Sequence, residues 1–482
     1  MSFIDKLFPN RKSKIINKRE YSASKINRLT SDWVFAPVKW DDDIYSAIRT
    51  VRNRARDLYK NDDYARRFVN LCQMNIVGNA GFMLQVKSKD DNGIDDVMAN
   101  QWIEDAWTEW GKPENCTITG RLSFRELCML LVLHASRDGE FLAKKLFNSN
   151  SKFGFQLQVL EPDMLVETLN QYYSNNSEIK MGVETVNQKP IAYHIAEVLN
   201  EYSTSARRVP ASEIIHGYRQ ESAFNVRGMS WLTNSMTRIK MLAGYEEASL
   251  VNARASASKM GFFETSADGG EYTGQDKDAN GNIISSAEAG TFEQLPIGMK
   301  FNAYDPKYPD AQHSEFVKGM LRGISSGLGI SYNLLANDLE NVNYSSIRAG
   351  LLDERENWKQ LQSWFVDIFL TPVFSAWLKD ALLMGAITSP RGVPLPASKY
   401  EKFNKPTWIG RRWAWVDPEG DINANIKARS SGMNTLTRIL AEQGLDVEET
   451  LKEIANENAM AEKYGISLYV KEPNAPSAPK IN

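Results

Sequence analysis

Residues 230–259 read SWLTNSMTRIKMLAGYEEASLVNARASASK, and this stretch decides the fold. It has no proline, a single glycine at Gly244 and many alanines, so little in it interrupts a helix and much of it favours one. At 1.5 Å per residue, roughly 30 helical residues would span about 45 Å. Most helices of soluble proteins have only about three or four turns. We therefore expect an unusually long helical rod here.

An acid-rich insert follows this rod. Residues 262–310 hold nine acidic and three basic residues, a net charge of −6, and contain GG and DANG, which favour turns between short strands. A second helix is expected over about residues 311–330. After a polar loop, ISYNLLANDLENVN (330–343), a third helix begins near Ser345 and should kink at Pro372. The middle of the chain therefore predicts two helical rods that bracket a turn-rich insert.

Residues 41–228 alternate short helical and strand patterns, which indicates an α+β region. Residues 43–60 place apolar side chains at helical spacing. The opposite face of that helix carries three arginines, Arg52, Arg54 and Arg56. Ser123 and Glu126 match a capping box at the start of another helix. FGFQLQVLEPD (153–163) alternates apolar and polar residues, as a half-buried strand does.

The two ends of the chain differ from its middle. Residues 1–30 hold eight Lys or Arg against two acidic residues, so residues 1–40 are expected to form a basic arm. This arm is either a solvated extension or a docking arm. A proline-rich linker near 390–406 precedes short helices that end before Gly465. The final residues, KEPNAPSAPKIN, are expected to be disordered.

The composition is that of a globular protein. The 482 residues are 42% hydrophobic and 24% charged, with a net charge of −3. A protein that grips DNA over its whole surface usually has a clear basic excess, so that class is excluded. Cys72, Cys116 and Cys128 are odd in number and lack CxxC spacing, which favours free thiols in a reducing compartment. Neither a membrane span nor a signal-peptide core is found, so we expect a cytoplasmic protein without membrane contact.

Motifs for catalysis, cofactor binding and metal binding are missing from the sequence. It contains no P-loop, no H-E-x-x-H and no G-x-S-x-G. Four dispersed histidines favour structural roles: His134, His194, His216 and His313. DKDANG (276–281) begins like an EF-hand loop, but Ala287 stands where the twelfth position needs glutamate. A polar turn is favoured there, with weak cation binding as the alternative, and we expect no catalytic, cofactor or metal residues.

Five segments carry a resemblance through their order and spacing. They are RARDLYKNDDYARRFVNLCQMNIVG (54–78), LQVLEPDML (157–165) followed by MGVETVNQKPIAYHI (181–195), HGYRQESAFNVRGMSWL (216–232), AGTFEQLPIGMKFNAYDPKYP (289–309) and residues 413–466, which begin WAWVDPEGD. In that order they resemble the opening double helix, wing strands, approach to the stem, return from the clip and C-terminal region of lambda-type portal proteins of tailed bacteriophages. The resemblance covers about residues 40–470. Residues 1–40 and 269–288 depart from the family's pattern.

The resemblance implies an α+β portal fold with an α/β wing, a long-helix stem, a small β-containing clip and a helical C-terminal crown. The implied ranges are a basic arm (1–40), wing (41–228), stem helix (229–260), clip (261–310), second stem helix (311–330), tunnel loop (331–343), long kinked wing helix with its linker (344–407), crown (408–466) and disordered tail (467–482).

The resemblance also implies a function. Proteins of this family form a closed ring, typically of twelve subunits, at one capsid vertex of the virion, after assembly in the host cytoplasm. The ring is a channel for packaging and ejecting double-stranded DNA. Implied partners are that DNA, terminase, scaffold, the major capsid protein and the head–tail adaptor. The alternatives are an enzyme of the phage head, such as a nuclease or protease, and another structural ring or adaptor protein.

Two groups of residues are candidates for contact with DNA. Lys318 and Arg322 lie four residues apart on the second stem helix and so share one face, which either lines the channel or pairs with Glu315 and its neighbours. The tunnel-loop candidates are Asn337, Asp338, Glu340, Asn341 and Asn343. They would offer hydrogen bonds to a passing backbone without strong attraction, or simply solvate an interhelical loop. The acidic clip would repel DNA phosphates or bind a basic partner.

Overall fold

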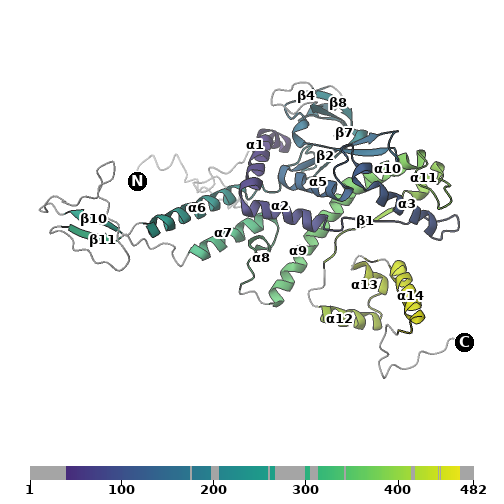
Figure 1. Cartoon of the computed structure of the whole chain (residues 1–482). Coiled ribbons are helices and arrows are strands. Elements are labelled where there is room, and N and C mark those ends of the chain that lie inside the picture. The colour runs from purple at the N-terminus through teal and green to yellow at the C-terminus, as the bar shows by residue number, and fades with distance from the viewer. Residues whose placement is uncertain are drawn as a thin grey trace, which may run out of the picture.

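The structure is a computed structural model that describes residues 39–173, 176–196, 206–258, 261–265, 299–303, 313–340, 344–413, 418–442, 445 and 447–466. A body of helices and sheets carries a long two-helix projection on one side, and three C-terminal helices lie beside the body (Figure 1). Predictions for the basic arm, the cation-site motif at 276–281, Asn341, Asn343 and the tail fall outside the described residues. Within the described part of the chain, no helix is both long and apolar enough to cross a membrane.

Three helices near the N-terminus pack together: α1 (Trp40–Asn61), α2 (Asp63–Ile76) and α5 (Phe124–Asp138). Asp62 caps α2, because its side chain accepts a hydrogen bond from the Ala65 amide at 2.8 Å. The capping box predicted at Ser123 and Glu126 is confirmed. Gly139 ends α5 with φ of +96°, in the left-handed region that favours glycine.

Antiparallel sheets cover this helical layer. One has the order β3-β2-β9 and is formed by β2 (Glu140–Phe147), β3 (Phe155–Leu160) and β9 (Ile214–Tyr218). A second has the order β4-β5-β6-β7-β8 and consists of β4 (Gln171–Tyr172), β5 (Ser177–Lys180), β6 (Val183–Val186), β7 (Lys189–Ala196) and β8 (Ala206–Pro210). Short 3₁₀ turns η3 (Pro162–Met164) and η4 (Ala211–Glu213) link these strands. The strand predicted within 153–163 is confirmed as β3.

A long kinked helix crosses the body. It consists of α9 (Tyr344–Phe365), a π-helical turn (Val366–Leu370) and α10 (Thr371–Leu383). The kink expected at Pro372 takes the form of this π turn, in which the Thr371 amide donates to the Val366 carbonyl. Trp377 of α10 is fully buried and lies 5.0 Å, centroid to centroid, from the Trp107 ring.

The remaining elements of the body pack around α10. These elements are β1 (Met83–Val86), α3 (Val97–Trp110), α4 (Pro113–Cys116), η6 (Ala397–Lys399), α11 (Tyr400–Phe403) and β12 (Pro406–Ile409). β12 pairs with β1 in antiparallel register, with Trp408 opposite Leu84. The range 408–466, expected as a separate helical unit, therefore begins inside a strand of the body. Its helices are α12 (Pro418–Ser430), α13 (Leu436–Glu442) and α14 (Val447–Lys463).

The projection contains α6 (Met236–Ser258), the antiparallel pair β10 (Gly261–Thr265) and β11 (Met299–Ala303), and α7 (His313–Leu328). The rod predicted over 230–259 is confirmed from Met236 onward, whereas residues 231–235 form turns. The loop predicted over 330–343 is wrong in part, because α8 (Tyr332–Ala336) is helical. A continuous hydrophobic core runs from the body into the base of the projection, where Ile239 and Ile324 are fully buried.

Candidate functional site

The outer half of the α6–α7 projection has almost no core of its own. Among described side chains, none from Ala243 to Arg254 is buried, and burial on α7 begins at Leu321. Tyr245 packs on α7 with its ring 4.8 Å from that of Phe316, centroid to centroid. Three large apolar side chains of α6 are exposed: Met241, Leu250 and Val251. Leu250 and Val251 are neighbours in the sequence, whereas Met241 lies nine residues earlier and on the opposite side of α6.

Lys318 and Arg322 occupy one side of α7. The Lys318 ammonium is 3.9 Å from a carboxylate oxygen of Glu315, a long ion pair with an exposed partner. Such pairs contribute little, about 0–1 kcal/mol. Arg322 is exposed, and its guanidinium lies 5.5 Å from the centre of the Tyr332 ring. Among the described residues, Lys318 therefore has one loose ion pair, with Glu315, and Arg322 has no carboxylate within ion-pair distance.

The segment after α7 folds back beside these two cations. The Tyr332 hydroxyl donates to Asp338 Oδ2 at 2.7 Å, and Asp338 Oδ1 accepts from the Glu340 amide at 3.0 Å. The Tyr332 hydrogen bond lowers the pKa of Asp338, and the charges of Lys318 and Arg322 lower it further. Burial and the Asp338 contact raise the pKa of Tyr332 to about 12. The structure thus brings both predicted cations close to one predicted loop residue.

Tyr332 was not predicted as part of this group. The signal for it was weak, since a helix of five residues falls below the length at which helical spacing is informative. The backbone of Asn337 adopts φ of +53° and ends α8. Asn337 and Glu340 are exposed beside Asp338. This patch offers donors and acceptors of both charges, so it can contact a polyanion with little net attraction.

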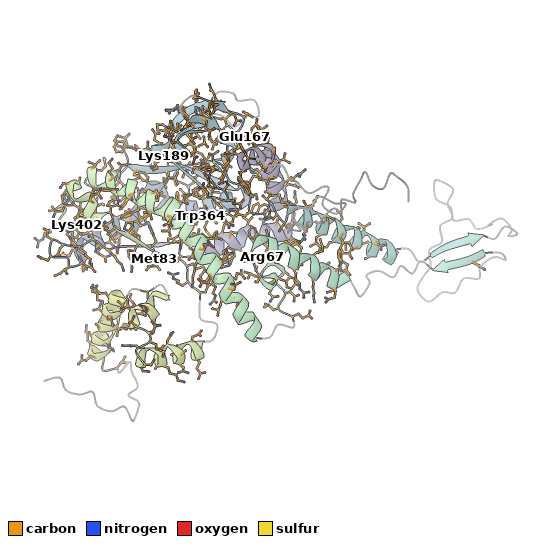
Figure 2. All side chains as sticks on the ribbon, turned by 180° about the vertical axis from the view of Figure 1, so that it is seen from behind. Arg67, Met83, Glu167, Lys189, Trp364 and Lys402 are labelled. Atoms are coloured by element: carbon orange, nitrogen blue, oxygen red, sulfur yellow. The ribbon has the colours of Figure 1, made fainter. Side chains whose placement is uncertain are left out.

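Contacts from the body fix the position of this segment. The Arg67 side chain, labelled at the base of the projection in Figure 2, donates to the Leu334 carbonyl at 3.3 Å. Asn357 of α9 donates to the Gly329 carbonyl at 3.0 Å, and the Ser331 amide donates to Glu354 at 3.3 Å. The patch is therefore held by α2 on one side and by α9 on the other.

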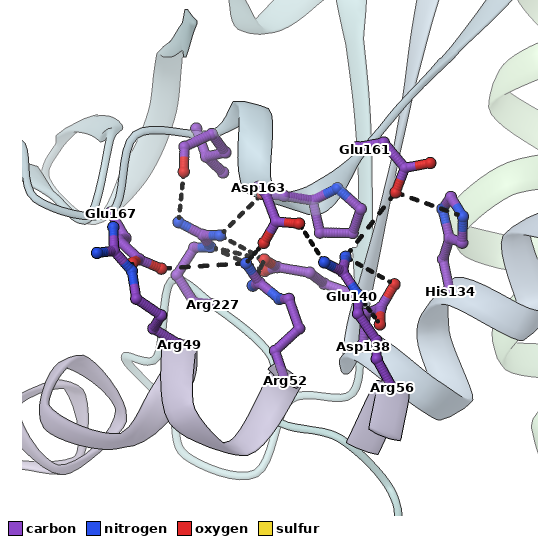
Figure 3. Close-up of polar contacts among 12 residues, drawn as sticks. Arg49, Arg52, Arg56, His134, Asp138, Glu140, Glu161, Asp163, Glu167 and Arg227 are labelled. Atoms are coloured by element: carbon purple, nitrogen blue, oxygen red, sulfur yellow. Dashed lines mark hydrogen bonds and ion pairs between the residues drawn. The ribbon is translucent and has the colours of Figure 1, made fainter. Parts of the chain in front are cut away.

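A buried ion network ties the entry of the projection to α1 and the sheet. Glu140, at the start of β2, accepts from Arg52 Nη2 at 2.7 Å and from Arg227 Nε at 2.9 Å (Figure 3). His216 Nε2 lies 3.0 Å from Glu140 Oε2, the oxygen that also accepts from Arg227 Nε at 2.9 Å. Burial alone would raise the pKa of Glu140, but the Arg227 charge, the His216 hydrogen bond and the Arg52 charge hold that pKa well below its usual range.

The network overturns one sequence expectation. Arg52 and Arg56 were placed on a face opposite the apolar stripe, yet Arg52 is only 1% exposed and bonds Asp163 at 2.9 Å. Arg56 pairs with Asp138 at 2.9 Å and also with Asp163. The expectation failed because α1 is covered on two sides, by its helical neighbours and by the β2 and η3 segment. Periodicity reports apolar faces, and it does not detect a buried polar one.

His134, Asp138 and Glu161 carry possible ligand atoms within 4.8 Å of one another. Both Asp138 oxygens are already bonded by guanidinium groups, from Arg56 and Arg137. A cation there would displace or face two positive charges, so this arrangement is better explained as the edge of the ion network. Burial lowers the pKa of His134, which keeps its ring neutral.

Comparisons of the sequence with known proteins identify its family. The sequence pattern of phage portal proteins of the lambda family matches residues 27–362. The probable portal protein of Halomonas phage phiHAP-1 is 31% identical over 93% of this chain and 88% of that protein. Portal protein B of Escherichia phage lambda is 22% identical over 86% of this chain and 84% of its own length.

Solved structures give a weaker likeness. A chain from the neck of an empty GTA particle is 12% identical, with a TM-score of 0.44 over 86% of this chain and 97% of that chain. The match of the family pattern and the extended identity to the phiHAP-1 protein show that this chain belongs to the lambda family of phage portal proteins, which are structural proteins and not enzymes.

Proposed function

We propose that the chain assembles as a closed ring at one vertex of the virion capsid, with twelve copies as the expected number. The observation that carries this proposal is the outer half of the α6–α7 projection. That part leaves Leu250 and Val251 exposed and buries none of the described side chains from Ala243 to Arg254, and Met241 is exposed nearer the base of α6. Neighbouring projections packed side by side would cover these side chains. A ring of such rods would enclose an open channel.

We assign the expected portal regions to the elements of the structure as follows. The wing (41–228) corresponds to α1 through β9, and the stem helices (229–260 and 311–330) correspond to α6 and α7. The clip (261–310) contains β10 and β11, the tunnel loop (331–343) contains α8, and the kinked helix (344–407) contains α9 and α10. The crown (408–466) contains α12, α13 and α14, and its first two residues belong to β12, which pairs with β1 of the wing.

The proposed channel carries double-stranded DNA during packaging and ejection. Lys318 and Arg322, with Asn337, Asp338 and Glu340, would contact the DNA backbone, and Asn341 and Asn343 of the same loop would take part. Since Asp338 lies close to both cations, the patch has little net charge. Weak attraction of this kind lets a polyanion slide. Terminase, scaffold, the major capsid protein and the head–tail adaptor are the proposed protein partners, met first in the host cytoplasm.

One pair of matched variants tests the ring. Leu250 on α6 and Val393 in the body are equally exposed, at 62% each. Leu250→Glu should prevent assembly and yield a folded monomer, since the charge would be buried between neighbouring rods. Val393→Glu should leave the ring intact. Sedimentation velocity reports both results. If Leu250→Glu assembles as well as the unmodified chain, α6 does not form the contact between subunits.

A further inference from the structure

Two guanidinium groups lie close to the ring of Trp413. The Arg355 guanidinium is 6.0 Å from the ring centre and that of Arg411 is 5.7 Å from it. Arg355 comes from α9, while Arg411 and Trp413 follow β12. Arg412, between the latter two, is exposed. Segments distant in the sequence thus place two guanidinium groups at one indole, and the exposed Arg412 lies next to them in the chain.

The cluster is built rigidly. Arg411 donates to Asn75 Oδ1 at 2.7 Å, and the Trp413 indole donates to the same oxygen at 3.1 Å. Gln362 donates to the backbone carbonyls of Asn75 and Arg411 at 2.9 and 3.1 Å. The left-handed turn at Gly78 leaves room for the Arg411 side chain, because a Cβ there would lie 2.9 Å from Arg411 Cβ. These contacts fix the arginine before any ligand arrives.

The positive charge of the cluster is not balanced within the described part of the chain. Among the described residues, no carboxylate lies within ion-pair distance of Arg355, Arg411 or Arg412, whereas each arginine of the ion network has at least one. Burial lowers the pKa of Arg355, and Asp421 of α12 offsets this only in part. Burial, followed by the charge of Arg355, lowers the pKa of Arg411. The cluster therefore retains a capacity for an anion.

We propose that Arg355, Arg411 and Arg412 form a phosphate-binding site for the backbone of duplex DNA. Guanidinium groups match phosphate oxygens in geometry, and stacking on an aromatic ring preserves their outward N–H donors. A single carboxylate would satisfy one guanidinium, whereas duplex DNA presents a charge about every 1.7 Å along its axis. Three arginines without an ion-pair partner among the described residues fit such a polyanion better than a carboxylate of a neighbouring subunit.

The position of the site agrees with this ligand and rests on the proposed channel. Arg355 lies eleven residues after Tyr344, the first residue of α9. At 1.5 Å per residue this is about 16 Å along the helix from the segment proposed as the tunnel loop. The site would thus hold DNA just beyond the loop.

The test is fluorescence anisotropy of the full chain with a labelled 30-base-pair duplex over a series of salt concentrations. Arg355→Gln with Arg412→Gln removes two charges and leaves the structural Arg411 in place. The matched control, Lys189→Gln with Arg207→Gln, removes two exposed charges from the distant sheet. We expect weaker binding for the first variant alone. Its slope of log Kobs against log salt should fall by about 0.9 for each phosphate that the variant no longer neutralises.

Equal affinity and slope in the two variants would overturn the proposal. Dissociation of an assembled ring in the Arg355→Gln, Arg412→Gln variant alone would also overturn it, by showing that the arginines bind a neighbouring subunit. A second titration adds inorganic phosphate at constant ionic strength, and DNA binding should persist. Loss of DNA binding at millimolar phosphate would identify a free-phosphate site instead. Failure of the unmodified chain to form rings would count against the proposed function separately, since the anisotropy can be measured on unassembled chain.

Discussion

Replacing Glu140 with glutamine should destabilise the body of the protein more than replacing any exposed charged residue would. The Glu140 carboxylate is fully buried and accepts from Arg52 Nη2 at 2.7 Å and from Arg227 Nε at 2.9 and 3.0 Å. It also accepts from the Gly228 amide at 3.3 Å. A glutamine keeps the shape of the side chain and removes its charge.

The size of the effect follows from what remains buried. Arg52 keeps Asp163 as an anionic partner, but among the described residues Arg227 would face only neutral acceptors, the new side-chain amide oxygen and backbone carbonyls. Breaking a buried ion pair by removing one partner costs about 3–5 kcal/mol. The folded protein holds the pKa of Glu140 below its ordinary value of 4.5. The ionised Glu140 side chain therefore stabilises the fold at pH values above 4.5, and this contribution is lost only as the pH falls through the lower pKa of the folded state.

Urea unfolding of the unassembled chain at pH 7 measures the effect. The matched control is Glu356→Gln, which breaks an exposed pair with Lys359 on α9. That change should lower the free energy of unfolding by about 0–1 kcal/mol. If Glu140→Gln costs no more than the control, the buried network does not hold α1, β2 and the entry of α6 together.

Three further predictions concern pH, backbone and DNA. Burial lowers the pKa of His134 and of His216 below 6.5, so the unfolded chain binds more protons than the folded chain does. The free energy of unfolding should therefore fall between pH 7 and pH 5, by at most about 1.4 kcal/mol per pH unit for each histidine. Urea midpoints that do not change with pH would contradict this. Gly139→Ala should lower the melting temperature, because φ is +96° and a Cβ would lie 2.4 Å from a backbone carbon, at a cost above about 1 kcal/mol. Lys318→Ala with Arg322→Ala should alter DNA packaging in a salt-dependent way, and packaging unchanged at every salt concentration would count against the channel contact.

Local sequence signals predicted much of the fold. The capping box before α5, the period of α1 and the proline-free run of α6 are each local, so each could be recognised without tertiary contacts. The start of α6 was placed too early because residues 231–235 have no proline or glycine to mark the turn that precedes it. Helix α8 was missed because five residues are too few for a period.

The polar sites were harder to predict, for a physical reason. Glu140 and Arg227 are 87 residues apart and meet only when the sheet packs on α1. The arginines near Trp413 come from α9 and from the segment after β12, so no sequence spacing reveals them. By contrast, Lys318 and Arg322 were found together because a helix places residues four apart on one face.

The closed ring is the central claim, and the mass of the purified full chain tests it most directly. Native mass spectrometry with electron microscopy of the same sample should show a whole-number multiple of 54.5 kDa arranged as a ring with an open centre. A particle of 54.5 kDa that persists at the concentrations and salt conditions that favour assembly would contradict the account.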